Sequence, residues 1–224
     1  MRFVLASSSP RRREMIASLG IPYEIIKPDV DETLHADEDP FTYVTRVSRS
    51  KVAAVLAQLE VSRPRETVVL AADTIVLAAD TVGVDGGGDL LAKPADADEA
   101  RAMLRRLRAV THLVATHVEI ASVGYTPPDG QAHGASFTAR TWVTMRDYSD
   151  AEIDAYVASG DPLDKAGGYA IQHPGFRPVA RIEGCYSNVV GLPLCQVKQA
   201  LAAMGVAGIV APAGCDCPPY PSLD

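Results

Sequence analysis

Serines followed by arginines near the start of the chain could bind a phosphate group. The segment Leu5–Arg13 runs from apolar residues through three serines into Pro10 and three arginines. Ser9 is suited to cap a helix and Pro10 to its first position, so we expect a helix that Gly20 ends. Arginines in a first helical turn oppose the helix dipole, and a bound anion would remove that penalty. A basic surface turn is the alternative.

Two acidic positions are also candidates for chemistry. The pair Asp73–Thr74 follows an unbroken apolar run, residues 67–72, of the kind that forms a strand buried on both faces. Glu32 closes an acidic loop over residues 29–32. The alternatives are a turn at the end of the strand for Asp73 and a solvated loop acid for Glu32, since carboxylates in loops are usually surface groups.

A third block, residues 161–172, places Lys165 before the paired glycines Gly167 and Gly168. Paired glycines suggest that the backbone approaches a ligand closely, with Lys165 contacting a phosphate or the edge of a base. A tight turn beside a solvated lysine is the alternative, and taken singly it is the commoner case.

These residues must be positioned by strands and helices that alternate along the chain, which predicts an α/β domain. We expect strands or extended segments at residues 3–6, 23–27, 67–72, 75–79, 90–94, 111–123 and 136–145. The last two should form an antiparallel hairpin. We expect helices from Pro10, from Pro40 to about Leu59, from Asp96 to Leu107 and from Ser149 to Val157.

Composition limits the class of protein. The 224 residues are 47% hydrophobic, enough to bury a core as one large domain or two lobes. A net charge of -7 argues against sequence-independent binding of nucleic acid. Residues 3–6 are too short for the core of a signal peptide and no segment approaches a membrane span, so we expect a cytoplasmic protein without membrane contact.

The four cysteines, residues 185, 195, 215 and 217, lack the paired spacing of a zinc site. Free thiols are the expectation. We predict a single domain over residues 1–204 and a flexible C-terminal tail over residues 205–224, which is rich in proline and glycine near its end.

Together these blocks resemble the Maf family of nucleoside triphosphate pyrophosphatases, from Leu5 to about Ala200. The matching segments, in order, are Leu-Ala-Ser-x-Ser-Pro-Arg-Arg, Asp31–Glu32, Lys51, residues 72–74, Lys93–Pro94, His112, residues 164–172 and residues 188–194. The resemblance implies a Maf/ITPase-like fold, in which a mixed twisted sheet is flanked by helices and two lobes surround a central cleft. It also implies a homodimer.

The activity implied by the resemblance is hydrolysis of a nucleoside triphosphate between its α and β phosphates, as a house-cleaning step on the nucleotide pool. Asp73 would take a proton from the attacking water, and Glu32 would bind Mg²⁺ or Mn²⁺ together with Asp73, although these two roles could be reversed. Lys51 and Lys93 complete the implied catalytic set. The triphosphate would lie against Ser7, Ser9, Arg12, Arg13, Lys51 and Lys93, and Lys165 would contact either a phosphate or the edge of the base.

The base pocket resembles that of a subgroup acting on dTTP and UTP, which has the equivalents of Arg11, Thr74 and Gln172. A neutral amide can pair with both a carbonyl and an N–H group of uracil or thymine, whereas an acid at the same position suits cationic 7-methylguanine. The sequence therefore predicts a pyrimidine nucleotide. Ser8, His117 and a glycine-rich loop over residues 85–89 depart from the usual family pattern.

Two other functions remain as alternatives. The chain could be a nucleotide-binding regulator of cell division, or a pyrophosphatase for modified purine nucleotides such as 7-methyl-GTP. The intact set of Asp73, Glu32, Lys51 and Lys93 favours turnover over binding alone. His112 also matches the family, yet a histidine within a strand is more often a hydrogen-bonded structural residue than a catalyst.

Overall fold

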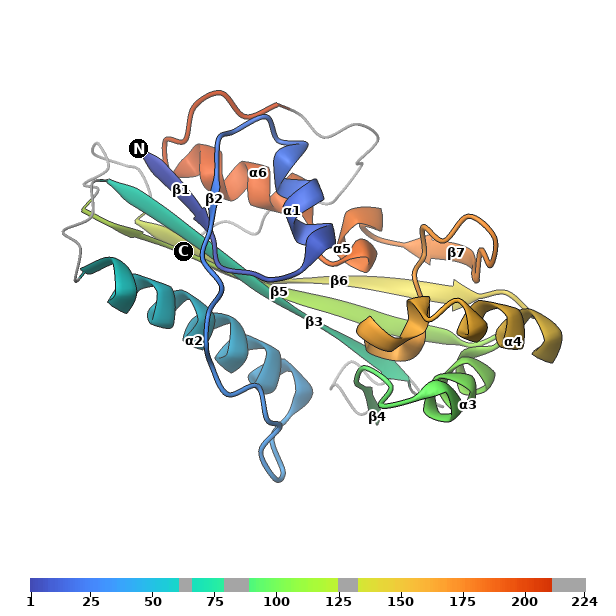
Figure 1. Ribbon diagram of the computed structural model, residues 1–224. Helices are drawn as coiled ribbons and strands as arrows, with labels where there is room; N and C mark the ends of the chain where they lie inside the picture. Colours follow the sequence, from blue (N-terminus) through green and yellow to red (C-terminus); the bar gives the residue numbers. More distant parts are fainter. Residues whose placement is uncertain (61–65, 79–88, 125–132, 211–224) are drawn as a thin grey trace. The chain divides into compact units, whose positions relative to one another are not determined.

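The computed structural model describes residues 1–60, 66–78, 89–124 and 133–210. A mixed seven-stranded sheet has the strand order β2-β1-β3-β5-β6-β7, and β4 pairs with β3 (Figure 1). This sheet with its helices confirms the predicted α/β class, while the predicted central cleft stays a prediction. The strands are β1 (Arg2–Leu5), β2 (Glu24–Ile25), β3 (Thr67–Ala78), β4 (Asp89–Leu91), β5 (Thr111–Val123), β6 (Gly134–Met145) and β7 (Val179–Glu183).

The four predicted helices begin within one residue of their predicted starts. The helices are α1 (Pro10–Ala17), α2 (Pro40–Glu60), α3 (Ala97–Leu107), α4 (Asp150–Ala158), α5 (Tyr186–Val190) and α6 (Leu194–Ala203), with 3-10 turns η1 (Asp161–Asp164) and η2 (Ala166–Gly168). The sequence analysis did not predict α5 and α6. Ser9 caps α1 and Asp96 caps α3 through side-chain oxygens that accept backbone N–H groups. Ser149 and Glu152 form the predicted capping box of α4.

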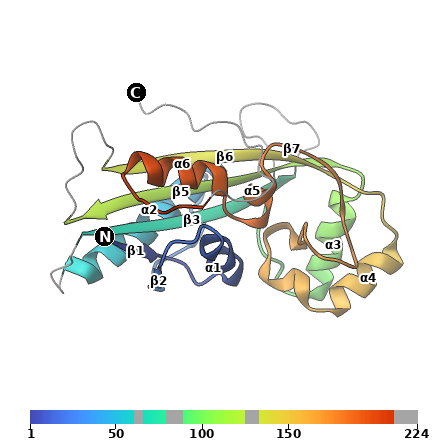
Figure 2. The same ribbon diagram turned by 90° about the horizontal axis from the view of Figure 1, so that it is seen from above.

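The chain divides into two compact units. The first comprises Met1–Asp73, Thr116–Ala139 and Gly191–Asp224, and the second comprises Thr74–Ala115 and Arg140–Val190. The strands β3, β5 and β6 each contribute residues to both units. In Figure 2 the arrows of β5 and β6, which are neighbours in the sheet, point in opposite directions, as predicted for a hairpin.

The first unit is built on parallel strands. β1 pairs with β2 on one side and with β3 on the other, both in parallel. Alternate apolar residues of β3, of β1 and of the position just after β1 pack against the buried face of α2, in a cluster of Val4, Ala6, Val52, Val55, Leu59, Val69 and Ala71. The helices α1 and α6 lie on the opposite face (Figures 1 and 2). Each face of this part of the sheet is therefore covered.

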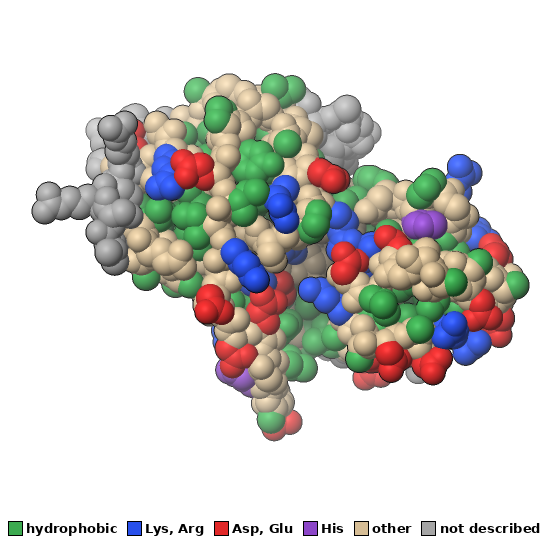
Figure 3. All heavy atoms as spheres, viewed as in Figure 1, with side chains coloured by type: hydrophobic (Ala, Val, Ile, Leu, Met, Phe, Trp, Pro, Cys, Tyr) green, Lys and Arg blue, Asp and Glu red, His purple; other side chains and the backbone are tan. Residues whose placement is uncertain are grey.

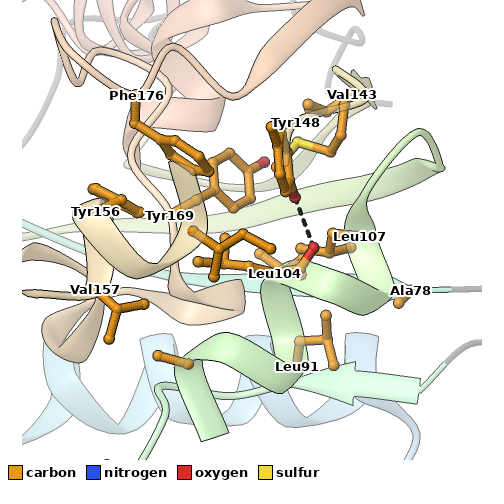
Figure 4. Close-up of a cluster of buried hydrophobic side chains, with 14 of the residues drawn as sticks. Ala78, Leu91, Leu104, Leu107, Val143, Tyr148, Tyr156, Val157, Tyr169 and Phe176 are labelled. Atoms are coloured by element: carbon orange, nitrogen blue, oxygen red, sulfur yellow. Dashed lines mark hydrogen bonds between the residues drawn. The ribbon is translucent and has the colours of Figure 1, made fainter. Parts of the chain in front are cut away.

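The second unit is built on antiparallel pairs. β4 pairs with the second half of β3, and β7 pairs with β6 through a register shift at Thr144/Met145. Side chains of α3 and α4 enclose an apolar core with several aromatic rings (Figure 4). This core includes Leu104, Leu107, Val143, Met145, Tyr148, Ile153, Tyr156, Val157, Tyr169 and Phe176.

Two predicted extended segments form the single strand that carries Asp73. The sequence suggested that the apolar run ends at Asp73–Thr74 and that an extended segment follows, and β3 runs through both without interruption to Ala78. No glycine or proline follows that could break the strand, and residues 75–78 are buried apolar residues. Asp73 and Thr74 therefore lie inside a strand, and the interpretation of Asp73 as a turn residue is wrong.

Residues after Met204 are only partly described. Val206 is buried, and the backbone N–H of Val210 donates to the carbonyl oxygen of Leu19. The single domain over residues 1–204 stays a prediction. The flexible tail also stays a prediction, because residues 211–224, which include two of the cysteines, lie outside the described residues. Residues 85–88 of the glycine-rich loop and residues 125–132, between the two strands of the predicted hairpin, also lie outside them.

Two further expectations concern cysteines and membranes. The two described cysteines, Cys185 and Cys195, are thiols that form no disulfide within the described residues. Within the part of the chain that the structure describes, no helix has the length and hydropathy needed to cross a bilayer.

Candidate active site

One lysine ammonium lies between two carboxylates in the first unit. Lys51 of α2 is buried, and its Nζ lies 2.9 Å from Oδ1 of Asp73 and 3.1 Å from Oε1 of Glu32. Asp73 comes from β3, and Glu32 comes from the loop before α2. Two carboxylates that would repel each other are held close together because a cation lies between them.

The loop that carries Glu32 is fastened to α2. The Tyr43 hydroxyl donates to the Glu32 carbonyl oxygen at 3.0 Å, and Nη2 of Arg46 donates to the Thr33 carbonyl oxygen at 2.9 Å. Arg46 also forms a two-pronged ion pair with Glu38, at 2.6 and 2.8 Å. These bonds from Arg46 lower the pKa of Glu38 to about 2, and burial raises the pKa of Tyr43 to about 12.

Arg12 is bound to the backbone beside Asp73. Its Nη1 donates to the Ala72 carbonyl oxygen at 2.7 Å, and its Nε donates to the Gly191 carbonyl oxygen at 2.9 Å. Burial lowers the pKa of Arg12, while the charge of Asp73 acts in the opposite direction. Arg12 therefore holds the strand next to the candidate base as well as supplying a positive charge.

The serines before α1 form the predicted turn. Ser7 is buried and its hydroxyl accepts the backbone N–H of Ser9, whose own hydroxyl accepts the N–H of Arg12 at 3.4 Å. Arg13 donates to the Ser8 carbonyl oxygen, but its buried Nε–H has no hydrogen-bond acceptor among the described residues. A buried donor of this kind is costly unless a ligand accepts from it.

The structure brings Arg11, Arg12, Glu32, Lys51 and Asp73 close together in the first unit, since Arg11, Glu32 and Asp73 all act on the charge of Arg12. Figure 3 shows Lys and Arg side chains lying among Asp and Glu side chains on the visible face. The other four predicted residues, Thr74, Lys93, Lys165 and Gln172, belong to the second unit.

Within the second unit these four differ in exposure. Lys93 and Gln172 are exposed, Thr74 is half-buried, and Lys165 is buried. The ammonium of Lys165 donates to the Asp161 carbonyl oxygen at 2.6 Å, to Oδ1 of Asp161 at 2.8 Å and to Oδ1 of Asp164 at 2.6 Å. An ammonium has three donors, so contact of Lys165 with a substrate would require it to exchange one of these bonds. That contact stays a prediction.

The paired glycines have a structural role. Gly167 and Gly168 both have positive φ angles, 71° and 68°, and a Cβ on Gly167 would lie 3.1 Å from the side chain of Val76. The N–H of Gly167 donates to the Ala92 carbonyl oxygen, next to Lys93. The glycines therefore form a tight turn, and the hydrogen bond from Gly167 holds this turn next to Lys93, which is predicted to bind the triphosphate.

The two histidines of β5 have hydrogen-bonded structural positions. His112 is fully buried and its Nε2 lies 2.7 Å from the Tyr169 hydroxyl. His117 departs from the usual family pattern. Its Nδ1 lies 2.9 Å from the Thr138 hydroxyl, and its Nε2 lies 3.2 Å from Oε2 of Glu119. The interpretation of His112 as a structural residue fits its buried position.

The donor set limits how a metal could bind. Among the described residues no group of three or more His, Cys, Asp or Glu side chains is arranged to hold a metal ion. Glu32 and Asp73 offer two carboxylates that already share one cation, the Lys51 ammonium. This pair fits Mg²⁺ or Mn²⁺ only if other oxygens complete the coordination, as substrate phosphates commonly do for Mg²⁺.

Sequence reasoning missed the residues that hold the loops. Tyr43, Arg46 and Glu38 fasten the Glu32 loop. Tyr156 contacts the segment that carries Gln172, and Asp161 accepts from the Tyr156 hydroxyl. The only available signal was that Tyr43 and Arg46 lie on the same predicted helix as Lys51. Their partners depend on where the loops fold back, which local patterns do not encode.

The family model and the curated relatives agree on one family. Residues 2–204 match the model of the family described as Maf-like protein. A dTTP/UTP pyrophosphatase of Hahella chejuensis is 42% identical over 206 residues, which cover 92% of this chain and 93% of the relative. One from Myxococcus xanthus is 45% identical over 203 residues, covering 91% and 92%. A solved HAM1 protein from Coxiella burnetii aligns with 90% of this chain and 98% of its own at 15% identity and a TM-score of 0.45, too low to support a conclusion.

Proposed function

This chain belongs to the Maf family, and on that premise we propose that it is a pyrophosphatase that hydrolyses dTTP and UTP to the nucleoside monophosphate and pyrophosphate. Relatives that are 41 to 45% identical over most of this chain carry the name dTTP/UTP pyrophosphatase, which supports this substrate class. The structural observation that carries the proposal is the ion-paired group of Lys51, Asp73 and Glu32.

The reaction needs a base and a cationic binding site. A water oxygen forms a bond to the α-phosphorus, and the bond from that phosphorus to the bridging oxygen breaks, so pyrophosphate leaves. Asp73 accepts the proton of the attacking water. Lys51 lies against Asp73 and Glu32 at 2.9 and 3.1 Å, so it orients both carboxylates and adds positive charge where the phosphates carry negative charge.

Glu32 and Asp73 would hold a divalent cation, with phosphate oxygens of the nucleotide supplying further ligands. When bound, such a cation would neutralise phosphate charge and polarise the phosphoryl group. Ser7, Ser9, Arg12, Arg13 and Lys93 bind the triphosphate. The Nε–H of Arg13, which has no acceptor among the described residues, supports its role in donating to an anion.

Base selection belongs to Arg11, Thr74 and Gln172. The exposed amide of Gln172 can accept from the N3–H and donate to a carbonyl of thymine or uracil. Cytosine presents an acceptor at N3 and an amino group beside it, so it pairs poorly with an amide held in this orientation. A site that hydrogen-bonds one base in this way discriminates strongly against another.

Product analysis tests the proposal. Incubation with dTTP or UTP and Mg²⁺ should yield monophosphate and pyrophosphate, measured by anion-exchange chromatography. Release of orthophosphate alone would identify a phosphatase instead. Preference for 7-methyl-GTP would favour the modified-purine alternative, and nucleotide binding without any turnover would favour the regulator of cell division.

The role of Asp73 has its own test. Asp73→Asn removes the base while keeping shape, so kcat should fall by about 10²-fold or more with dTTP affinity largely retained. Asp154→Asn is the matched control, because Asp154 is an ion-paired aspartate on α4 that has no role in the proposed reaction. A wild-type rate in Asp73→Asn would show that another group is the base.

A further inference from the structure

One tyrosine contacts the segment carrying Gln172 on both sides of that residue. The backbone N–H of Ala170 donates to the Tyr156 hydroxyl at 3.0 Å. On the other side, the His173 ring meets the Tyr156 ring edge to face at 4.7 Å, and the Phe176 ring stacks on it at 4.4 Å. Gln172 lies between these attachments in the chain and is itself exposed.

Tyr156 is itself held in place. It is 3% exposed and lies on α4, the helix that begins with a capping box. It belongs to the aromatic core of the second unit (Figure 4). Its hydroxyl donates to Oδ2 of Asp161 at 2.6 Å. With its ring packed and its hydroxyl bonded on two sides, Tyr156 has little freedom to move.

The network extends to Lys165. The Lys165 ammonium donates to Oδ1 of Asp161, so Lys165, Asp161, Tyr156 and the N–H of Ala170 form one continuous chain of hydrogen bonds. Burial raises the pKa of Asp161, but the hydrogen bonds from Lys165 and Tyr156 outweigh it and keep the pKa below its ordinary value. Asp161 therefore remains an anion and a strong acceptor for the tyrosine hydroxyl.

We propose that Tyr156 is a positioning residue for base selection. This inference rests on the proposed function, in which Gln172 recognises the base. Tyr156 holds the backbone of Ala170 before Gln172 and the ring of His173 after it, and so fixes the direction in which the Gln172 amide faces the base. An amide can distinguish thymine from cytosine only while its carbonyl and amino ends keep their orientation. Loss of the Tyr156 hydroxyl leaves the buried N–H of Ala170 without this acceptor and releases the segment.

The test compares two buried tyrosines of the same core. Tyr156→Phe removes the hydroxyl and keeps the ring contacts. Tyr148→Phe is the control, because the Tyr148 hydroxyl donates to the Leu104 carbonyl oxygen of α3 at 2.8 Å and not to the Gln172 segment (Figure 4). The ratio of kcat/KM for dTTP over dCTP is measured for each, since partial unfolding would lower both rates equally and leave the ratio unchanged.

We expect the ratio to fall about tenfold in Tyr156→Phe and to stay within about twofold of wild type in Tyr148→Phe. Gln172→Ala should lower the ratio at least as much, and adding Tyr156→Phe to it should lower the ratio no further, because Tyr156 acts through Gln172. His173→Ala, which removes the contact on the other side of Gln172, gives a second reading in the same direction if Tyr156→Phe folds poorly.

The outcomes separate two claims. A wild-type chain with no preference for thymine and uracil nucleotides overturns the proposed function and this inference with it. A wild-type preference that Tyr156→Phe and His173→Ala both leave unchanged overturns the inference alone. An equal loss for dTTP and dCTP in both variants would assign Tyr156 to stability and would also overturn the inference.

Discussion

At the scale of single residues, surroundings decide what a titratable group can do. His112 is fully buried, its Nε2 faces the Tyr169 hydroxyl, and its Nδ1 has no hydrogen-bond partner among the described residues. Burial lowers the pKa of His112 from 6.5 to about 4. This histidine is therefore neutral at pH 7 and suited to packing rather than to proton transfer at that pH.

His112 gives the stability of the chain a defined dependence on pH. Between pH 6.5 and about 4 the unfolded chain binds a proton that the native chain does not, so stability falls as pH drops through this range. The full loss is up to about 3 kcal/mol, and the contribution is complete above pH 6.5. Urea unfolding at pH 7 and pH 4.5 should show a smaller drop for His112→Gln than for wild type. Equal drops would contradict the low pKa.

Arg11 and Arg12 are neighbours with different predicted roles. Arg12 donates to two backbone carbonyl oxygens, those of Ala72 and Gly191, so Arg12→Ala should lower kcat/KM for every nucleotide and cost about 1–3 kcal/mol of stability. Arg11→Ala should mainly change the preference between dTTP and dGTP. Steady-state kinetics with both nucleotides and thermal melts separate the two. Uniform loss in both variants would remove Arg11 from base selection.

At the scale of elements, α2 organises the candidate site. Lys51 contacts both carboxylates, while Tyr43 and Arg46 of the same helix hold the loop that carries Glu32. A long helix packed on the sheet through Val52, Val55 and Leu59 is a rigid support for a loop that has few apolar contacts of its own. The Glu32 loop therefore keeps its conformation through polar bonds to α2.

Weakening the polar bonds between α2 and the Glu32 loop should change the Mg²⁺ requirement more than kcat. Arg46→Gln removes the ion pair with Glu38 and should raise the Mg²⁺ concentration for half-maximal rate about three- to tenfold, with little change in kcat at saturating Mg²⁺. Arg49→Gln is the control, because Arg49 lies on the same helix but pairs with Glu119 at the surface. A Mg²⁺ dependence that is the same in both variants would show that the loop needs no such support.

At the scale of the whole molecule, the metal and the nucleotide should bind as a linked pair. With only two carboxylates available among the described residues, a divalent cation alone has an incomplete set of ligands. The predicted homodimer is a separate property of the whole molecule, and sedimentation equilibrium would test it.

Thermal unfolding measures this linkage. Mg²⁺ alone should change Tm by no more than about 1 °C, whereas Mg²⁺ with a nonhydrolysable dTTP analogue should raise Tm by several degrees and more than the analogue with EDTA does. The extra rise should be lost in Glu32→Gln. A large rise with Mg²⁺ alone would reveal a complete metal site that does not need the nucleotide.

The sequence by itself determined the local structure of this protein. Ser9, Asp96 and Ser149 cap helices as predicted, because a cap needs only a side-chain oxygen and the next few backbone N–H groups. Burial of strands also followed from apolar runs. The continuity of β3 through Asp73 did not follow from the sequence, because Asp73 is polar and its charge is compensated by Lys51, which belongs to another element.

Only the tertiary structure decided which polar groups meet. Lys51 lies 22 residues from Asp73 and Arg12 lies 179 residues from Gly191, so no local pattern could pair them. The parallel pairing of β1 with β3 brings the segment after β1 beside β3. It also places α2 against both strands. The tertiary structure likewise decided that Tyr156 holds the residues around Gln172, because that contact forms only after the chain beyond η1 folds back on α4, and that the Lys165 ammonium is bound to Asp161 and Asp164 of η1.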